Sequence, residues 1–238
     1  MNHPPPGLTA IITGYALGRR FCVILDGTLY VLIDEASNQW YGITDCFKSV
    51  GKHVNVATLD QSIYMVGGRT DYVNLSASII HWTGGQTFDE YPAMMSVARS
   101  AMTSIVSKDG SKWYLFGGYD SNGSSQLGEC YDFASQTMTQ LSPLLEPRAA
   151  GAATEFGSDG RILVCGGEAE TDTAYGFNIT SCEIYNPRTN HWTRAADIPA
   201  ELEQVFTIPI SGGVLLFGVP TRHEIGLRMY FYDPSADS

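Results

Sequence analysis

The segment Ile162-Leu163-Val164-Cys165-Gly166-Gly167 decides the fold, because its pattern of an apolar strand followed by two glycines recurs along the chain. Two further copies are Ile63–Gly68 and Trp113–Gly118, and a degenerate copy follows as Val214–Val219. The first glycines of successive copies are 50 and 49 residues apart (117 − 67 and 166 − 117). A period of about 50 residues predicts a repeat architecture in which each repeat is one supersecondary unit.

Each repeat is predicted to form four antiparallel strands. The first is an apolar segment such as 101–106, and an Asp-Gly turn follows at 109–110 or 159–160. The second strand ends at the glycine pair. The third ends in an aromatic residue followed by Asp or Asn, and the fourth begins seven residues later, as from Tyr185 to Trp192. A first repeat without the glycine pair is predicted from strands at Phe21–Leu25, Leu29–Asp34 and Gln39–Thr44.

These repeats resemble the kelch repeat family. The resemblance rests on the glycine pairs, on Tyr185-Asn186-Pro187 with Trp192, and on Arg99 and Arg148, each 18 residues before the first glycine of its copy. It implies an all-β fold, a kelch-type β-propeller with five blades of mostly four antiparallel strands. We expect one domain over residues 1–238, with repeats at 8–47, 48–97, 98–146, 147–200 and 201–238.

The strand count leaves the closure of the ring open, because 19 strands are found, with Leu8–Thr13 counted as one of them, where five complete blades need 20. Leu8–Thr13 could be the outer strand of the last blade and close the ring, which is the arrangement we favour. A three-stranded blade is the second alternative, and a piece of a longer protein is the third.

Several repeated residues are predicted to be structural. Glycine permits a positive φ and close backbone packing, and no helical pattern follows any glycine pair, so a phosphate-binding loop is not expected. Aromatic residues at equivalent repeat positions indicate packing between blades. The predicted structural residues are Gly67, Gly68, Gly117, Gly118, Gly166, Gly167, Tyr131, Tyr185, Trp40 and Trp192.

Composition excludes several classes of partner. The net charge of −11 and the absence of Lys/Arg runs argue against nucleic acid and anionic membranes. The N-terminus lacks a basic region typical of a signal peptide, and no segment has the ~20 apolar residues of a membrane span. Five widely spaced cysteines without a Cys-x-x-Cys pair argue against zinc. We therefore expect a cytoplasmic monomer without cofactor or metal.

The family that these repeats resemble also contains enzymes, so the resemblance implies catalysis as an alternative function. Copper oxidases similar to galactose oxidase need paired histidines, but the five histidines here are scattered. The iron motif of specifier proteins is matched only by its Glu-x3-Asp half, at Glu168 and Asp172, with Gly176 at the third ligand. A sialic acid epimerase would use Glu168 or Glu170 with Arg148. We assign no catalytic residue and keep a small-molecule or carbohydrate enzyme as the alternative.

A non-catalytic protein- or peptide-binding scaffold is the predicted function, possibly a substrate adaptor by analogy with the family. Variable loops after the glycine pairs are expected to form its contact face. In the family, arginines equivalent to Arg99 and Arg148 often bind acidic peptides; alternatively, these arginines pair with nearby acids and orient loops. Lys52 and Glu201 or Glu203 replace the arginine in the flanking repeats. The candidate partner-binding residues are Arg99, Arg148, Arg69, Tyr72, Tyr119, Asp120, Glu168, Tyr175 and Arg222.

Overall fold

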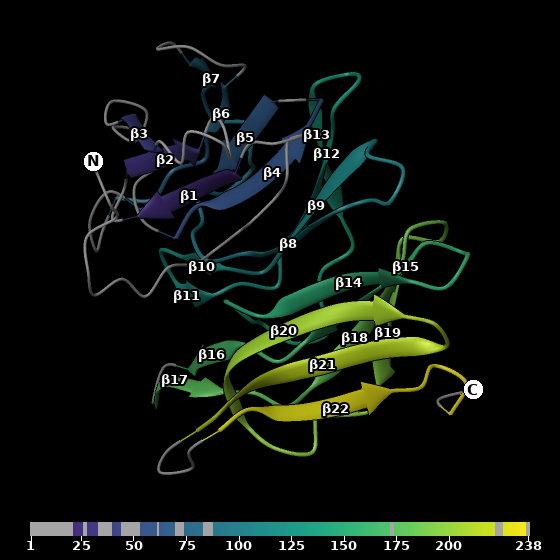
Figure 1. The fold of residues 1–238 in the computed structure, drawn as a ribbon. Coiled ribbons are helices and arrows are strands. Elements are labelled where there is room, and N and C mark those ends of the chain that lie inside the picture. The colour runs from purple at the N-terminus through teal and green to yellow at the C-terminus, as the bar shows by residue number, and fades with distance from the viewer. Residues whose placement is uncertain are drawn as a thin grey trace. The chain divides into compact units, whose positions relative to one another are not determined.

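The computed structural model describes residues 21–25, 28–32, 40–43, 53–60, 62–69, 74–82, 88–171, 174–221 and 226–236. The regular secondary structure in these residues consists of β-strands, as the sequence predicts. The chain divides into two compact units, Met1–Ser100 and Ala101–Ser238, which we describe separately (Figure 1). Within the described residues, no helix has the length and hydropathy to cross a lipid bilayer.

The N-terminal unit contains a three-stranded and a four-stranded sheet, both antiparallel. The first sheet is formed by β1 (Phe21–Leu25), β2 (Thr28–Leu32) and β3 (Trp40–Ile43). The second is formed by β4 (Asn55–Leu59), β5 (Ser62–Val66), β6 (Ile79–Trp82) and β7 (Asp89–Tyr91). The three strands predicted for the first repeat are therefore present. The predicted segment Leu8–Thr13 lies outside the described residues.

The C-terminal unit contains three larger sheets and two small hairpins. The first sheet has the order β13-β12-β9-β8, from β8 (Thr103–Val106), β9 (Lys112–Phe116), β12 (Gly128–Asp132) and β13 (Thr137–Leu141). The second consists of β14 (Ala152–Phe156), β15 (Arg161–Cys165), β18 (Cys182–Asn186) and β19 (His191–Ala195). The last consists of β20 (Leu202–Ile210), β21 (Gly213–Pro220) and β22 (Arg228–Tyr232).

The register confirms why the glycine pairs recur. In the β9–β12 ladder, Phe116 lies opposite Gly128, so β9 ends where the pair Gly117-Gly118 begins. Both glycines have positive φ, 63° and 97°, a region that residues with a Cβ atom rarely adopt. A Cβ atom on Gly117 would lie 2.0 Å from the carbonyl oxygen of Arg148. Backbone geometry and close packing therefore require glycine at Gly117.

Aromatic side chains at repeated positions fill the space between neighbouring sheets of the C-terminal unit. Tyr185 and Trp192, from the β14-β15-β18-β19 sheet, share a buried cluster with Tyr114 and Phe116 of β9. The rings of Phe116 and Trp192 are 5.0 Å apart, edge to face. The indole Nε1 of Trp192 also donates to the carbonyl oxygen of Ser142, 2.9 Å away in the preceding repeat. Tyr185 and Trp192 therefore lie in the packing between these two sheets.

A second cluster joins the β14-β15-β18-β19 sheet to the last sheet. Leu163 and Cys165 from β15 lie against Val214, Leu216 and Tyr232 from the last sheet. Since Ile162 and Val164 face the preceding cluster, β15 is buried on both faces. Cys165 is a fully buried small hydrophobic residue, as predicted. The β14-β15-β18-β19 sheet therefore has an apolar layer on both sides.

Candidate functional site

The loops after two glycine pairs fold as β-hairpins. β10 (Tyr119–Asp120) pairs with β11 (Gly123–Ser124), and β16 (Glu168–Thr171) pairs with β17 (Ala174–Asn178). The sequence predicted loops here, because these strands are short and lack an alternating apolar pattern. Both hairpins lie at the glycine end of the strands, the left side of Figure 1, and β11 contacts β16.

Two side-chain hydrogen bonds join these hairpins of consecutive repeats. The hydroxyl of Tyr119 donates to Oε2 of Glu168 over 2.7 Å. The backbone N–H of Glu170 donates to Oγ of Ser124, also over 2.7 Å. Hydrogen bonds to a charged carboxylate are stronger than those between neutral groups. The hairpins β10–β11 and β16–β17, which we call the paired hairpins, therefore form one surface.

The backbone of residues 148 and 149 holds the paired hairpins by hydrogen bonds. The carbonyl oxygen of Arg148 accepts a 2.8 Å hydrogen bond from the N–H of Gly118, directly before β10. Ala149 exchanges two 2.8 Å backbone hydrogen bonds with Glu168, at the start of β16. One short segment thus positions the first strand of both hairpins.

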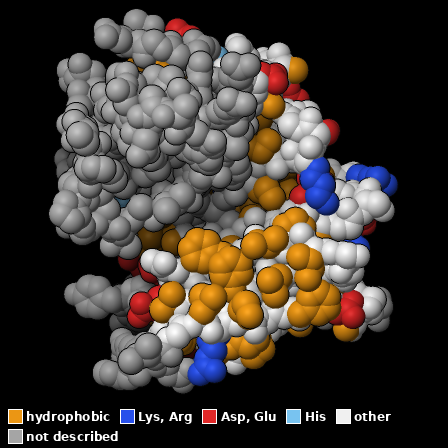
Figure 2. Space-filling view, in the orientation of Figure 1, with side chains coloured by type: hydrophobic (Ala, Val, Ile, Leu, Met, Phe, Trp, Pro, Cys, Tyr) orange, Lys and Arg blue, Asp and Glu red, His pale blue; other side chains and the backbone are white. Residues whose placement is uncertain are grey.

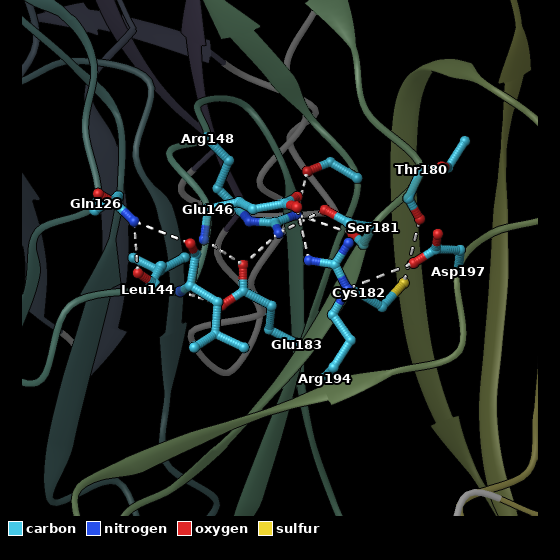
Figure 3. Close-up of polar contacts among 12 residues, drawn as sticks. Gln126, Leu144, Glu146, Arg148, Thr180, Ser181, Cys182, Glu183, Arg194 and Asp197 are labelled. Carbon is cyan, nitrogen blue, oxygen red and sulfur yellow. Dashed lines mark hydrogen bonds and ion pairs between the residues drawn. The ribbon is translucent and has the colours of Figure 1, made fainter.

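The Arg148 side chain is fully buried and fixes that segment (Figure 3). Its guanidinium donates 2.9 Å hydrogen bonds to the carbonyl oxygens of Gly166 and Ser181 and to Oγ of Ser181. It also forms a 2.5 Å ion pair with Oε1 of Glu183, whose side chain is equally buried. Of the two roles left open for Arg148, the structure therefore matches pairing with an acid and orienting a loop.

Glu183 is the residue that the sequence analysis missed. Its carboxylate accepts hydrogen bonds from the N–H groups of Leu145 (2.7 Å) and Glu146 (3.1 Å) as well as from Arg148. A signal was present, since Glu129 occupies the same place two residues before a repeated tyrosine and is also buried. A charged residue repeated inside an apolar strand indicates a buried partner of opposite charge.

The neighbouring Glu146 extends this network to the surface. Burial raises the pKa of its carboxyl, but hydrogen bonds from Ser181 and Arg194, and the charge of Arg194, lower the pKa overall. The ion pair from Nη1 of Arg194 to Glu146 is 2.7 Å long and partly exposed. Exposed ion pairs of this kind add little stability, so the buried Arg148–Glu183 pair is the central interaction of this polar network.

Arg99 is also fully buried, so neither Arg99 nor Arg148 offers a surface to a partner. Its backbone repeats the Arg148 arrangement, because its carbonyl oxygen accepts a 2.9 Å hydrogen bond from Gly68 N. Burial therefore removes both arginines from the candidate contact residues. It also removes the arginine that an epimerase-like site would need for a substrate carboxylate.

Only three of the other candidate partner-binding residues have described side chains that lie on the same surface. Tyr119, Asp120 and Glu168 lie on the paired hairpins, where Asp120 accepts a 2.7 Å hydrogen bond from the N–H of Asn122. Arg69 belongs to the N-terminal unit, and its guanidinium lies 3.2 Å from Nε2 of His53. Tyr175 lies in β17, but its side chain is outside the described part. Tyr72, Asp172 and Arg222 are outside it entirely, as is the Trp40 side chain.

Metal-binding clusters and surface depressions are the remaining places where chemistry could occur. No group of three or more His, Cys, Asp or Glu side chains in them is placed to hold a metal ion. A depression of about 350 Å³ lies at the other end of the strands, and its lining includes Asp109 and Asp159 from turns and Glu155 from β14. Asp109 already accepts hydrogen bonds from Ser107 and Ser111, and Glu155 accepts one from the N–H of Lys108. Asp159 forms a 2.8 Å ion pair with Arg161.

Comparisons with known proteins identify the repeats. A family model described as the Kelch motif matches residues 157–199. Beta-scruin of Limulus polyphemus is 26% identical over 214 residues, 85% of this chain and 23% of the relative. Human Kelch-like protein 23 is 25% identical over 179 residues, 71% of this chain and 28% of the relative. The chain thus spans about a quarter of the length of these relatives.

A solved structure supports the same fold. The protein in "Structure of YjhT" matches with a TM-score of 0.67 at 14% identity, over 86% of this chain and 71% of that one. Similarity at this identity concerns the fold alone. The all-β propeller class is confirmed, whereas the number of five blades stays a prediction. Residues 157–199 therefore match the Kelch motif, and over most of its length the chain is similar to scruin and Kelch-like proteins.

Proposed function

We propose that this chain is a non-catalytic protein-binding scaffold whose contact surface is the paired hairpins. The observation that carries the proposal is that two hairpins from consecutive repeats are joined into one surface over a rigid, buried base. Tyr119–Glu168 and Glu170–Ser124 join them, and Arg148–Glu183 fixes the segment beneath. Loops held on a rigid repeat scaffold are where recognition is expected.

The chemistry of the paired hairpins indicates the kind of partner. Phe177 is 46% exposed on β17, and an exposed aromatic ring is a typical anchor of a protein interface. Glu170 and Asp120 lie on the same hairpins, Glu170 is exposed, and the whole chain carries a net charge of −11. An acidic surface with an aromatic anchor favours a partner with Lys or Arg beside an apolar residue. The substrate-adaptor role and the cytoplasmic location expected from the sequence belong to this proposal.

Affinity capture with matched variants tests the proposal. The purified chain is immobilised beside a Glu170→Ala/Phe177→Ala variant and a control variant, Lys112→Ala/Arg188→Ala, at the other end of the strands. We expect a set of proteins from cells of the source organism to bind the wild type and the control but not the hairpin variant. Equal capture by all three chains would contradict the proposal, as would selective loss in the control.

A further inference from the structure

Cys165 and Cys182 lie directly opposite each other on the neighbouring strands β15 and β18. The N–H of Gly166 donates to the carbonyl oxygen of Ser181 over 3.1 Å, which is the hydrogen bond expected beside a non-hydrogen-bonded pair. The Cα atoms of such a pair are about 4.5 Å apart, and the side chains lie on the same face of the sheet. A disulfide needs Cα atoms about 4.4–6.8 Å apart, so the backbone already places the two cysteines within reach.

Both cysteines are free thiols in the apolar cluster between this sheet and the last one, and they are 0% and 2% exposed. Burial raises the pKa of the Cys165 thiol, and a hydrogen bond with the Cys182 thiol raises it further, so the two sulfur atoms are in contact. Cys130 is the third cysteine of the unit Ala101–Ser238 and is also buried. It lies opposite Tyr114 and Thr139, so it has no cysteine across from it.

The other repeats show that packing does not require cysteine at these two positions. The equivalent opposed pairs, each at the end of the strand that precedes the glycine position, are Val66–Ile79, Phe116–Gly128 and Phe217–Met229. Apolar residues of very different size therefore serve the same place in the sheet. Two opposed thiols add a chemistry that none of these pairs has, the formation of a disulfide.

We propose that Cys165 and Cys182 are a modification site, at which a small-molecule disulfide oxidises the pair to a cross-strand disulfide. One cysteine thiolate attacks the small-molecule disulfide, forms a mixed disulfide and releases the first small thiol. The other cysteine then attacks the protein sulfur of that mixed disulfide and releases the second. The new S–S bond replaces that of the oxidant, which leaves as two thiols that carry the two cysteine protons.

The position of the pair decides when the reaction takes place. The β20-β21-β22 sheet packs over both thiols with Val214, Leu216 and Tyr232, and the hydrophobic side chains of its other face gather in the orange area of Figure 2. The oxidant therefore reaches the pair while the chain folds, or when this sheet opens.

The disulfide closes a loop of 18 residues (182 − 165 + 1) that contains the β16–β17 hairpin. A covalent link of this kind stabilises the native state because it restricts the unfolded chain. The site is independent of the proposed binding function, since neither thiol belongs to the paired hairpins.

Refolding in a glutathione buffer tests the site. The full chain is unfolded in urea and refolded with oxidised and reduced glutathione, or with reduced glutathione alone, and circular dichroism verifies that both products are folded. Free thiols are then alkylated in urea, and the peptides are mapped by mass spectrometry. With oxidised glutathione we expect peptides joined through Cys165 and Cys182, an alkylated Cys130, and a Tm about 6–12 °C above that of the reduced product.

Matched variants separate the disulfide from other effects of the buffer. Cys165→Val introduces the residue that the copy Ile63–Gly68 has at this position, Val66, and should have the same Tm from both buffers. Cys182→Ala should behave in the same way. Cys130→Ala keeps the pair and should keep the shift in Tm.

Several results would overturn the proposal. Alkylation of both Cys165 and Cys182 in the chain folded with oxidised glutathione would do so. A disulfide from either residue to a different cysteine, or a mixed disulfide as the final product, would do the same. A Cys165–Cys182 link that lowers the Tm would show that the bond does not fit the native sheet. Export of the chain to the bacterial periplasm, where disulfides form, gives the same peptide map without refolding from urea.

Discussion

Replacing Arg148 by methionine tests the role assigned to the buried Arg148–Glu183 pair. Methionine keeps much of the side-chain volume but removes the guanidinium. The change leaves the Glu183 carboxylate charged and fully buried, and it removes hydrogen bonds from the carbonyl oxygens of Gly166 and Ser181. Removing one partner of a buried ion pair costs about 3–5 kcal/mol, because the other charge is left without compensation.

The expected loss is large compared with the stability of a typical domain, ~5–15 kcal/mol. At roughly 2–4 °C per kcal/mol for a chain of this size, the Tm should fall by about 10 °C. Urea unfolding followed by tryptophan fluorescence gives the free energy directly. The matched control is Arg188→Met, at an exposed turn residue, which should change stability by less than ~0.5 kcal/mol.

A second change distinguishes a buried charge pair from simple packing. Glu183→Gln carries no charge and keeps one acceptor oxygen, which can serve the N–H of either Leu145 or Glu146, because these two groups donate to different oxygens of the carboxylate. It should destabilise the wild type, yet stabilise the Arg148→Met variant, where it removes the uncompensated charge. A loss below ~1 kcal/mol for Arg148→Met, or the same effect of Glu183→Gln in both backgrounds, would refute the reasoning.

Three further predictions concern the glycines, the turns and the thiols. Gly117→Ala should cost more than ~2 kcal/mol in urea unfolding, because its Cβ would meet a backbone oxygen at 2.0 Å; Gly212→Ala, also at positive φ but with nothing within 4 Å, should cost only ~1 kcal/mol. Equal losses of stability in Gly117→Ala and Gly212→Ala would contradict the close packing of Gly117 against the Arg148 carbonyl oxygen. Hydrogen bonds from Ser107 and Ser111 lower the pKa of Asp109 to about 2, so its contribution, present above pH ~4, should be lost as pH falls towards 2. Unfolding free energies measured at several pH values should fall less in acid for Asp109→Asn than for the wild type, by less than ~1 kcal/mol. The same pH profile for both chains would contradict a stabilising role of the hydrogen bonds to Asp109. Burial raises the pKa of Cys130 to about 11 and that of Cys165 well above its ordinary value, so mass spectrometry after iodoacetamide treatment at pH 8 should find both unmodified until the chain unfolds. Rapid labelling of either in the native chain would be the opposing result.

The sequence predicted most of the fold because the repeat combines several local signals. An apolar strand, an Asp-Gly turn and a glycine pair at positive φ point to the same four-stranded unit. The spacing from Tyr185 to Trp192 likewise predicted the β18–β19 hairpin, where these two residues lie opposite each other. Local backbone preferences and long-range packing agree at these positions, so the pattern was sufficient.

The site was predicted less well because its residues act through contacts distant in sequence. Two roles were left open for Arg148, contact with a partner or pairing with a nearby acid. The acid itself was not identified, because Glu183 lies 35 residues further along the chain. This carboxylate offsets the cost of burying the guanidinium. The hairpins β10–β11 and β16–β17 were also missed as strands. These strands are short and lack an alternating apolar pattern. The hydrogen bond that joins the two hairpins, from Tyr119 to Glu168, spans 49 residues, and no local pattern indicates it.

Site-specific photo-cross-linking tests the central claim, that the paired hairpins bind protein. A photoreactive phenylalanine analogue is placed at Asn122, the exposed tip of the β10–β11 hairpin, and separately at Arg188, at the other end of the strands. Irradiation in cells of the source organism should give a discrete protein adduct from position 122 and none from position 188. Adducts from position 188 alone, or from neither position, would contradict the account.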